Sequence, residues 1–388
     1  GGLLLALAVQ PCPVVSRLSL KSAHNYLYIE PFMCSNRLMP YNWQLPDWPR
    51  FRYDATAVEG ALYAFAEKAG RVSGLLQGLP EGAKTQAVVD LLVAEAIKSS
   101  AIEGEHLSRP DVASSIRNQL GLNPVAEPVR DRLAKGSAEL MVSVRETWEQ
   151  PLSEETLFTW QGLLFQGSRQ AQTGIWRSHD EPMQVVSASI GQPTIHFEAP
   201  PSRRVPAEMA AFIDWFNSSD TALRKAPIRC AIAHLYFESI HPFEDGNGRI
   251  GRALAEKALS QGLRRPALLS LSRAIEAGKS GYYTALETAQ RGNEITPWLG
   301  YFVSVILQAQ DDAEQQVSFV LKKTRFFDRC KEALSPRQYK VVKRILDEGP
   351  SGFEGGMNAR KYASLTHVSK ATATRDLQEL VAKGILKP

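Results

Sequence analysis

The residues best suited to chemistry lie in one short stretch, Ile240–Arg252, with the sequence IHPFEDGNGRIGR. Proline at position 242 disfavours the α conformation at the residue before it, so a helix should end at His241 and hold its imidazole rigidly. An imidazole with an unperturbed pKa of about 6.5 suits a general base at neutral pH. The stretch therefore predicts His241 as a base at the end of a helix.

The second half of the stretch has the composition of an anion site. Glycine and asparagine allow a tight turn, and a helix that follows it would point its first N–H groups toward an anion. Two arginines three positions apart would share one face of that helix and could bind phosphate oxygens. A carboxylate beside them suits Mg²⁺ that is shared with phosphates. The predicted phosphate ligands are Gly246, Asn247, Gly248, Arg249 and Arg252, and the predicted Mg²⁺ ligand is Asp245.

Each part of the stretch also has a purely structural interpretation. A histidine at a helix end is more often structural than catalytic, and G-N-G alone is a turn. The D-x-N-G pattern lacks the spaced carboxylates and the later glutamate of a calcium loop. The chain has no G-x-x-x-x-G-K-[ST] phosphate loop and no kinase-type catalytic-loop motif. The combination of all parts in one stretch favours a nucleotide-phosphate site of another kind.

His241–Arg252 resembles the signature of the Fic family, H-P-F-x-[DE]-G-N-G-R-x-x-R, at every fixed position. The resemblance extends over roughly Tyr41–Gln308, because Trp43–Phe51 is similar to the short N-terminal module of one Fic subgroup. It implies an all-α helical bundle with a β-hairpin flap. It also implies transfer of AMP from ATP to a hydroxyl group of a target protein.

The resemblance assigns roles to individual residues. It implies that His241 deprotonates a Tyr, Thr or Ser hydroxyl and that Asp245 holds Mg²⁺ between the α- and β-phosphates. The G-N-G turn would stabilise charge on the phosphates, and the two arginines would hold the β- and γ-phosphates. The positions that match the adenosine pocket are Tyr282, Tyr283 and Gln290, the last of which is often Asn in relatives.

A second motif resembles the inhibitory motif of Fic proteins, [ST]-x-x-x-E-[GN]. Its residues here are Ser99, Glu103 and Gly104. The resemblance implies that Glu103 pairs with Arg252 and occupies the guanidinium that should bind the γ-phosphate. The plainer interpretation is a solvated glutamate beside a glycine that ends a helix. Some autoinhibited relatives also remove AMP, and the sequence does not decide whether this chain does.

The elements that must position these residues are mostly helices. Apolar residues at three-to-four spacing and capping residues predict helices over 55–76, 85–101, 108–120, 129–148, 153–165, 206–217, 222–240, 250–261, 271–277, 280–291 and 296–321. Turn residues at Pro80–Gly82 should separate the first two helices.

One stretch breaks the helical pattern. Met183–Phe197 holds two short β-prone runs around a turn at Gly191–Pro193, which predicts a hairpin. A lone hairpin is marginally stable, so it should lie against a site or a substrate strand. In Fic proteins the corresponding flap aligns the target by strand pairing. The target-docking residues implied here are Val185, Val186 and Ser187.

The C-terminal part differs in charge. From Lys322 onward the chain has 15 Lys and Arg against 7 Asp and Glu, whereas the rest has 30 against 34. Lys322–Arg329 is expected to be a basic connector, followed by helices over 335–347, 359–365 and 369–382. This part resembles a winged helix-turn-helix that lacks most of its wing strands. Its partner could be DNA or a protein, and both stay open.

These patterns predict four parts: a non-native or upstream segment over 1–38, a helical module with the inhibitory helix over 39–125, a Fic core over 126–321 and a helix-turn-helix-like module over 322–388. A weak signal peptide is the alternative for the first segment. Four scattered cysteines without a C-x-x-C pair suit a reducing cytosol, so we expect a cytoplasmic protein. No apolar run approaches the roughly 20 residues of a membrane span. The sequence does not decide between a monomer and a homodimer.

Three functions fit these observations. The first is an autoinhibited protein adenylyltransferase, with ATP as co-substrate. The second is a DNA-binding regulator that senses ATP, and the third is a Fic transferase with another phosphate-ester donor. An intact His241 favours an enzyme, since a sensor needs no base, and the complete G-N-G-R-x-x-R set favours a triphosphate.

Overall fold

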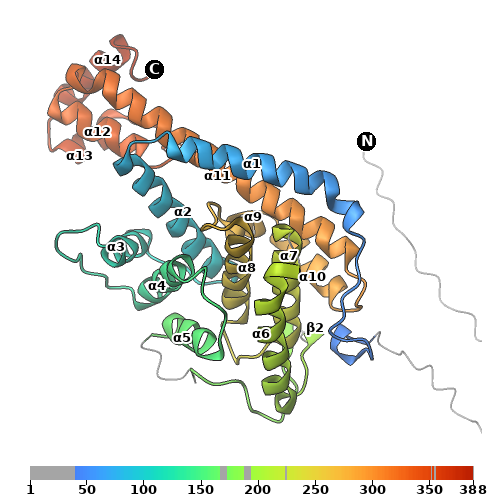
Figure 1. Cartoon of the computed structure of the whole chain (residues 1–388). Coiled ribbons are helices and arrows are strands. Elements are labelled where there is room, and N and C mark those ends of the chain that lie inside the picture. The colour runs from blue at the N-terminus through green and yellow to red at the C-terminus, as the bar shows by residue number, and fades with distance from the viewer. Residues whose placement is uncertain are drawn as a thin grey trace, which may run out of the picture. The chain divides into compact units, whose positions relative to one another are not determined.

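The structure is a computed structural model that describes residues 40–166, 173–187, 194–222, 225–350, 352–353 and 355–387. Within these ranges the protein is helical apart from one two-stranded hairpin (Figure 1). The predicted all-α class with a small β-hairpin is therefore confirmed. The predictions for residues 1–38 and for the Gly191–Pro193 turn lie outside the described residues.

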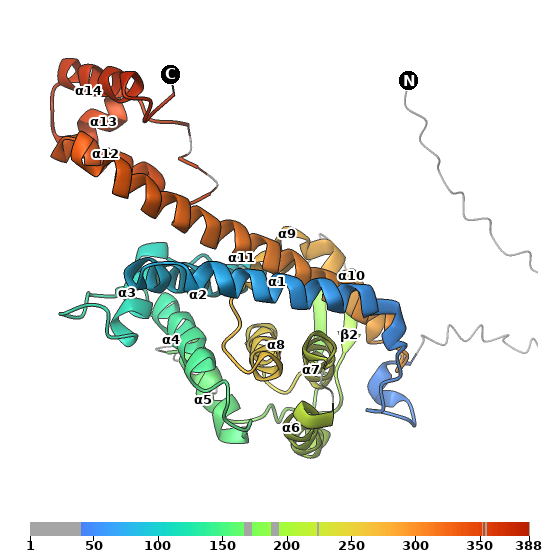
Figure 2. The same cartoon turned by 45° about the horizontal axis from the view of Figure 1, so that its top comes forward.

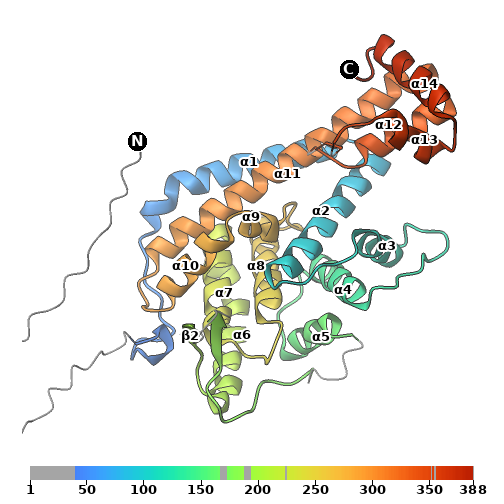
Figure 3. The ribbon, with the colours of Figure 1, turned by 180° about the vertical axis from the view of Figure 1, so that it is seen from behind.

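Two adjacent helices, α7 (Ala226–Ile240) and α8 (Asn247–Leu263), lie in the middle of the bundle (Figures 1 and 3). Every residue of α7 is buried, since apolar residues occur on all its sides. The other helices of the bundle surround this pair, and their bounds are Glu59–Gln77 (α1), Glu81–Ile102 (α2), Arg109–Gln119 (α3), Arg132–Glu146 (α4), Glu154–Leu164 (α5), Val205–Ala222 (α6), Leu271–Ala277 (α9) and Lys279–Ala289 (α10). The two central helices are joined by the predicted site stretch.

Helix α2 begins earlier than predicted. Pro80 was expected to open a turn that lasts to Gly82, but its carbonyl instead accepts hydrogen bonds from the N–H groups of Ala83 and Lys84. Proline suits the start of a helix because its fixed φ is close to the helical value. The turn is therefore confined to the residues before Glu81, and the prediction was wrong by about one helical turn.

The longest helix, α11 (Thr296–Cys330), corrects another prediction. It runs alongside α1 (Figures 2 and 3) and continues through Lys322–Arg329, which we expected to be a connector. The segment contains no proline or glycine, and Phe326 and Phe327 pack on the apolar core of the C-terminal helices. Burial of these two rings stabilises a helix in a segment whose positive charge alone suggested a linker. The boundary predicted at residue 322 falls inside α11.

The C-terminal helices are α12 (Pro336–Leu346), α13 (Ala359–Thr366) and α14 (Lys370–Ala382), close to the predicted ranges. They share a small core that includes Tyr362 and Leu380. None of the described residues after α11 forms a strand. The described part of the chain also contains no helix with the length and apolar character that a membrane crossing requires.

The predicted hairpin is confirmed as β1 (Gln184–Ser187) paired antiparallel with β2 (Thr194–Glu198). The register shifts between Val185, opposite Phe197, and Val186, opposite Ile195. One face packs on the segment near residue 43, where Trp43 Nε1 donates a hydrogen bond to the carbonyl of Glu198 at 2.7 Å. The segment around Trp43 thus supports the hairpin, which would be only marginally stable by itself.

Candidate active site

The end of α7 places His241 where the sequence predicted. The helix ends at Ile240, and His241 has φ 51° and ψ 62°, a left-handed conformation that is uncommon outside glycine. Arg177 holds this turn: its Nε donates to the carbonyl of His241 at 2.8 Å and its backbone N–H to that of Pro242 at 2.9 Å. Nothing in the local sequence indicated this role for Arg177, because it lies far from the motif in the chain.

The imidazole of His241 is held in its neutral form. Burial, helped by the positive charge of Arg177, lowers the pKa of His241 to about 4, although Glu103 acts in the opposite direction. Burial also raises the pKa of the neighbouring Glu238 to about 8, despite the charge of Arg252. At neutral pH the candidate base is therefore unprotonated and able to accept a proton.

The turn between the two helices contains a second left-handed residue, Gly246, besides His241. Gly246 has φ 89°, and the side chain of Asn247 closes the loop by accepting from the N–H of Phe243 at 2.9 Å and donating to its carbonyl at 2.8 Å. The amide of Asn247 is thus occupied within the loop. The groups that remain available to an anion are the backbone N–H groups at the start of α8, and the helix dipole adds to their attraction.

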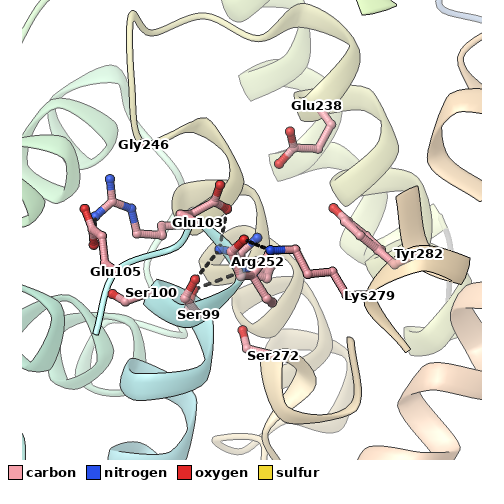
Figure 4. Close-up of polar contacts among 12 residues, drawn as sticks. Ser99, Ser100, Glu103, Glu105, Glu238, Gly246, Arg252, Ser272, Lys279 and Tyr282 are labelled. Atoms are coloured by element: carbon pink, nitrogen blue, oxygen red, sulfur yellow. Dashed lines mark hydrogen bonds and ion pairs between the residues drawn. The ribbon is translucent and has the colours of Figure 1, made fainter. Parts of the chain in front are cut away.

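Arg252 is bound by the end of α2 (Figure 4). Its Nε donates to Ser99 Oγ at 3.0 Å, and its Nη2 donates to the carbonyl of Ser99 and to Glu103 Oε1, both at 2.8 Å. The ion pair expected between Glu103 and Arg252 is therefore present, and the guanidinium is buried. Burial alone would raise the pKa of Glu103, but the Arg252 charge and hydrogen bond lower it overall, so the carboxyl is ionised at neutral pH.

The position of Glu103 follows from how α2 ends. Gly104 has φ 85°, and its N–H bonds to the carbonyl of Ala101 at 3.1 Å while that of Glu105 bonds to Ser100 at 3.0 Å. These two bonds form a Schellman motif, which needs a left-handed residue and therefore favours glycine. The motif turns the chain so that Glu103 reaches the start of α8. A Cβ at Gly248 would lie 2.3 Å from Glu103 Oε1, so glycine there leaves room for the carboxylate.

Arg249, the other arginine of the motif, contacts different acidic residues from Arg252. Its Nη1 is 2.7 Å from Glu105 Oε2, and its Nη2 is 3.6 Å from Asp245 Oδ1. The side chain is buried and does not line the cavity described next. The two arginines of the motif are thus held by two acidic residues, Glu103 and Glu105, two positions apart. The sequence did not single out Glu105.

A cavity of about 670 Å³ lies between α7, α8, α10 and the hairpin. Most of the predicted residues border it, namely Glu103, Val185, Val186, His241, Asp245, Gly246, Asn247, Gly248, Arg252, Tyr282, Tyr283 and Gln290. Those that do not border it are Ser99, Gly104, Ser187 and Arg249. The structure therefore brings the base, the helix N-terminus, the hairpin and the aromatic residues of α10 around one space.

The side chains of the three predicted adenosine-binding residues differ in how accessible they are to a ligand. Tyr282 is buried, with its hydroxyl 2.7 Å from His234 Nε2, and Tyr283 is 40% exposed. Gln290 Nε2 donates to the carbonyl of Glu238 at 3.2 Å, so its amide supports α7. Of the three residues, Tyr283 has the ring that is most accessible to an adenine in the cavity.

Several acidic and basic residues of the cavity wall were not predicted, among them Lys279 and Glu238. Lys279 Nζ donates to the carbonyl of Ile102, the residue before Glu103. Glu238 is buried, and its Oε2 lies 3.7 Å from His241 Nδ1. Figure 4 shows Lys279 and Glu238 in the same region as Arg252. An acid one turn before the candidate base on the same helix is a signal that the sequence contained. The contact of Lys279 joins segments that are far apart in the chain, and only the fold brings them together.

The side chains at the cavity offer Mg²⁺ one predicted ligand, Asp245. Asp245 is a single carboxylate, 71% exposed, at the rim of the cavity. The described residues contain no cluster of three or more side chains that could hold a metal alone. Mg²⁺ commonly binds through one or two carboxylates, several waters and substrate phosphates, so the residue fits an ion that arrives with a nucleotide.

Comparisons with known proteins agree with this geometry. Residues 151–259 match the Fic/DOC family, and residues 41–122 match a domain of unknown function, DUF4172. A probable protein adenylyltransferase of Aquifex aeolicus is 28% identical over 170 residues, which are 42% of this chain and 48% of that protein. A protein adenylyltransferase of Caenorhabditis briggsae is 32% identical over 94 residues, 24% of this chain and 17% of that protein. The matched region thus spans about half or less of these curated relatives.

Solved structures share the fold at low identity. A Fic family protein from Desulfovibrio desulfuricans has a TM-score of 0.50 at 22% identity, covering 83% of this chain and 89% of that one. A Fic domain-containing signaling protein from Bacteroides thetaiotaomicron has a TM-score of 0.50 at 18% identity, covering 66% and 97%. Residues 151–259, which hold the complete motif within this helical fold, therefore form a Fic/DOC family domain.

Proposed function

We propose that this chain is an autoinhibited protein adenylyltransferase, which transfers AMP from ATP to a Tyr, Thr or Ser hydroxyl of a target protein or of the chain itself. The observation that carries the proposal is that His241, the N-terminus of α8 and Arg252 border one cavity that the hairpin also borders. The names of the curated relatives support the same activity, since they are protein adenylyltransferases.

In the proposed reaction the target hydroxyl attacks the α-phosphorus of ATP. Its proton passes to Nε2 of His241, a new P–O bond forms, and the bond from the α-phosphorus to the bridging oxygen of the β-phosphate breaks. Pyrophosphate leaves with its electron pair. The N–H groups at the start of α8 hold phosphate oxygens, and Asp245 would hold Mg²⁺, whose charge would offset that of the phosphates.

The target segment would bind along the hairpin. Val186 is 50% exposed and Ile195 46%, so apolar side chains remain available on a sheet of only two strands. An extended peptide could add to such an edge through main-chain hydrogen bonds. This arrangement supports a protein substrate, because a small molecule would need no strand beside the base.

The proposed inhibition acts through Arg252. While Glu103 holds this buried guanidinium, the γ-phosphate of ATP must compete for it with a carboxylate at 2.8 Å. ATP would then bind weakly or with its α-phosphate out of line. Removal of AMP from a modified target, with Glu103 orienting a water molecule, is a further activity of the same site that the assay below also measures.

The test uses ATP labelled at either the α- or the γ-phosphate, with the Glu103→Gly chain and a cell lysate. We expect protein labelling from the α-label alone, because only AMP is transferred. A Glu103→Gly, His241→Ala double variant should still bind nucleotide but lose labelling. Labelling by the γ-phosphate, or labelling that persists without His241, would refute the proposal. Release of AMP from the labelled product by the wild-type chain would reveal the reverse activity.

A further inference from the structure

The last turn of α2 is bonded by backbone groups and by two side chains from distant elements. The last four carbonyls of a helix lack N–H partners within it. In α2 the carbonyls of Ser100 and Ala101 accept from N–H groups of the residues just after the helix, at 3.0 and 3.1 Å. The carbonyl of Ser99 accepts from Arg252 Nη2 at 2.8 Å, which joins it to α8. The remaining carbonyl is that of Ile102, the last residue of α2.

Lys279, the first residue of α10, donates to this remaining carbonyl through its Nζ. Ile102 is 1% exposed, so its carbonyl has little access to water and depends on the ammonium group. This carbonyl and the N–H of Glu103 belong to the same peptide group. The N–H is bonded as well, to the carbonyl of Ser100 at 3.0 Å. Both sides of the peptide are therefore held, which fixes the direction in which the Glu103 side chain leaves the backbone.

Lys279 gains no stability from the dipole of its own helix. The start of a helix carries partial positive charge, which disfavours a cation there. The first turn of α10 contains no acidic residue that would offset the charge of this lysine. The end of a helix is electronegative, so contact with the end of α2 favours the ammonium group. Its Nζ is also 5.9 Å from the centre of the Tyr283 ring, one turn later on α10.

We infer that Lys279 is a positioning residue for Glu103: it fixes the peptide group before Glu103 and thereby holds the carboxylate on Arg252. The inference rests on the proposed inhibition of AMP transfer by Glu103. Lys279 also borders the cavity, so its ammonium group has an alternative use as a direct ligand of a nucleotide phosphate. The two uses predict opposite results, because loss of a phosphate ligand lowers transfer, whereas loss of a support for Glu103 raises it.

Methionine has an unbranched side chain without charge, whereas arginine keeps a cationic donor. Lys279→Met should therefore leave the carbonyl of Ile102 without its partner, and Lys279→Arg should retain a bond to it. Lys98→Met is the matched control, because it removes an ammonium group from α2 that does not border the cavity. Lys98 pairs with Glu276 of α9 at 3.0 Å, and both side chains are about one-third exposed, so this ion pair contributes little to stability.

The first readout is backbone hydrogen exchange of the full chain without nucleotide. The N–H groups of Glu103, Gly104 and Glu105 all bond to carbonyls of the last turn of α2. We expect them to exchange about fivefold faster in Lys279→Met than in the wild type, a factor that corresponds to about 1 kcal/mol for local opening. Lys279→Arg and Lys98→Met should exchange like the wild type. Unchanged exchange in the buried helix α7 would show that the fold of each variant is intact.

The second readout is AMP transfer by each variant, with Glu103 present and in the Glu103→Gly background. With Glu103 present, Lys279→Met should raise incorporation of α-labelled AMP by about fivefold, in proportion to the same loss of order. In the Glu103→Gly background it should leave incorporation unchanged, because the residue that it positions is absent. Lys279→Arg and Lys98→Met should behave like the parent chain in both backgrounds.

Unchanged exchange at residues 103–105 in Lys279→Met would overturn the inference. A rise in transfer that occurs equally without Glu103, or that Lys98→Met reproduces, would overturn it as well. A loss of transfer in both backgrounds would also overturn it and would assign the ammonium group to the nucleotide. If no variant transfers AMP, the proposed function fails, and the exchange rates still decide whether Lys279 orders the peptide before Glu103.

Discussion

In the proposed mechanism the guanidinium of Arg252 would have two competing partners, Glu103 and a nucleotide phosphate. It is buried, and its contacts to Ser99 and Glu103 already use two of its three nitrogens. A phosphate that binds there must replace a charge-assisted contact of 2.8 Å. In the proposed mechanism the balance between Glu103 and a nucleotide at this single residue would therefore control the activity.

Replacement of Glu103 tests this competition. We expect Glu103→Gly to raise incorporation of α-labelled AMP by at least about tenfold, because a hydrogen bond to a charged group contributes about 1.5–3 kcal/mol and about 1.4 kcal/mol is a factor of ten. Glu105→Gln, which releases Arg249 outside the cavity, is the control and should raise AMP incorporation less than Glu103→Gly does. Equal labelling of wild type and Glu103→Gly would show that the ion pair does not restrain the enzyme.

The buried carboxyl of Glu238 should make stability depend on pH. Its pKa is about 8 in the folded chain against a reference of 4.5, so the folded state binds this proton more tightly than the unfolded state. The resulting stability is fully present below about pH 4.5 and is lost as the pH rises through about 8.

Glu238→Gln removes this dependence. At pH 9 we expect the variant to have a higher free energy of unfolding than the wild type, by an amount on the order of 1 kcal/mol for each unit of pKa shift. At pH 5 the two should be nearly equal. Urea denaturation at both pH values measures the difference, and a constant difference would contradict a protonated Glu238.

Among the secondary-structure elements, the ends of three helices determine the geometry of the candidate site. His241 sits at the end of α7, Gly246 precedes the start of α8, and Glu103 caps the end of α2. Sequence patterns located these ends to within a few residues, since proline, glycine and capping residues act locally. The extension of α11 through its basic segment was not predictable in this way, because it depends on a core formed by residues much later in the chain.

Packing between α4 and α5 gives a prediction at this scale. A Cβ at Gly136 would lie 1.9 Å from the carbonyl oxygen of Leu163, which belongs to the backbone and cannot easily move. Gly136→Ala should therefore destabilise the chain by about 1–3 kcal/mol. Gly162→Ala is the control on α5, since nothing lies within 4 Å of its Cβ.

Thermal or urea denaturation of both variants measures the effect. The control should be neutral or slightly stabilising, because alanine has the higher helix propensity. A Gly136→Ala variant as stable as the wild type would mean that the two helices can separate at little cost.

The whole molecule combines the DUF4172 region and the Fic region into one site. Residues 41–122 supply Glu103 and the support of the hairpin, and residues 151–259 supply the candidate base and the predicted phosphate-binding turn. Inhibition and target docking would thus both depend on the contact of one region with the other. Neither region contains the proposed site alone.

Nucleotide binding should therefore appear as a change in global stability. A ligand that binds only the folded state raises the melting temperature as its concentration exceeds its Kd. With saturating ATP and Mg²⁺ we expect a larger rise in Tm for Glu103→Gly than for the wild type. Arg252→Ala should show little rise in either background. Identical rises in wild type and Glu103→Gly would argue that Glu103 does not compete with ATP.

The sequence by itself predicted the helical class, the hairpin, the position of the candidate base at a helix end and most of the residues around the cavity. It could do so because the Fic motif is local: His241, the turn and Arg252 occupy one short stretch whose helix ends follow from proline and glycine. The pairing of Glu103 with Arg252 was predicted only through resemblance to a known family.

Only the tertiary structure decided how distant segments complete the site. It separated Arg249, held by Glu105 away from the cavity, from Arg252 at its edge. It also brought Arg177 to the turn at His241 and placed Glu238 against Gly251. Such contacts depend on the packing of elements up to about 150 positions apart, and side-chain direction across a packed interface is not encoded in local spacing.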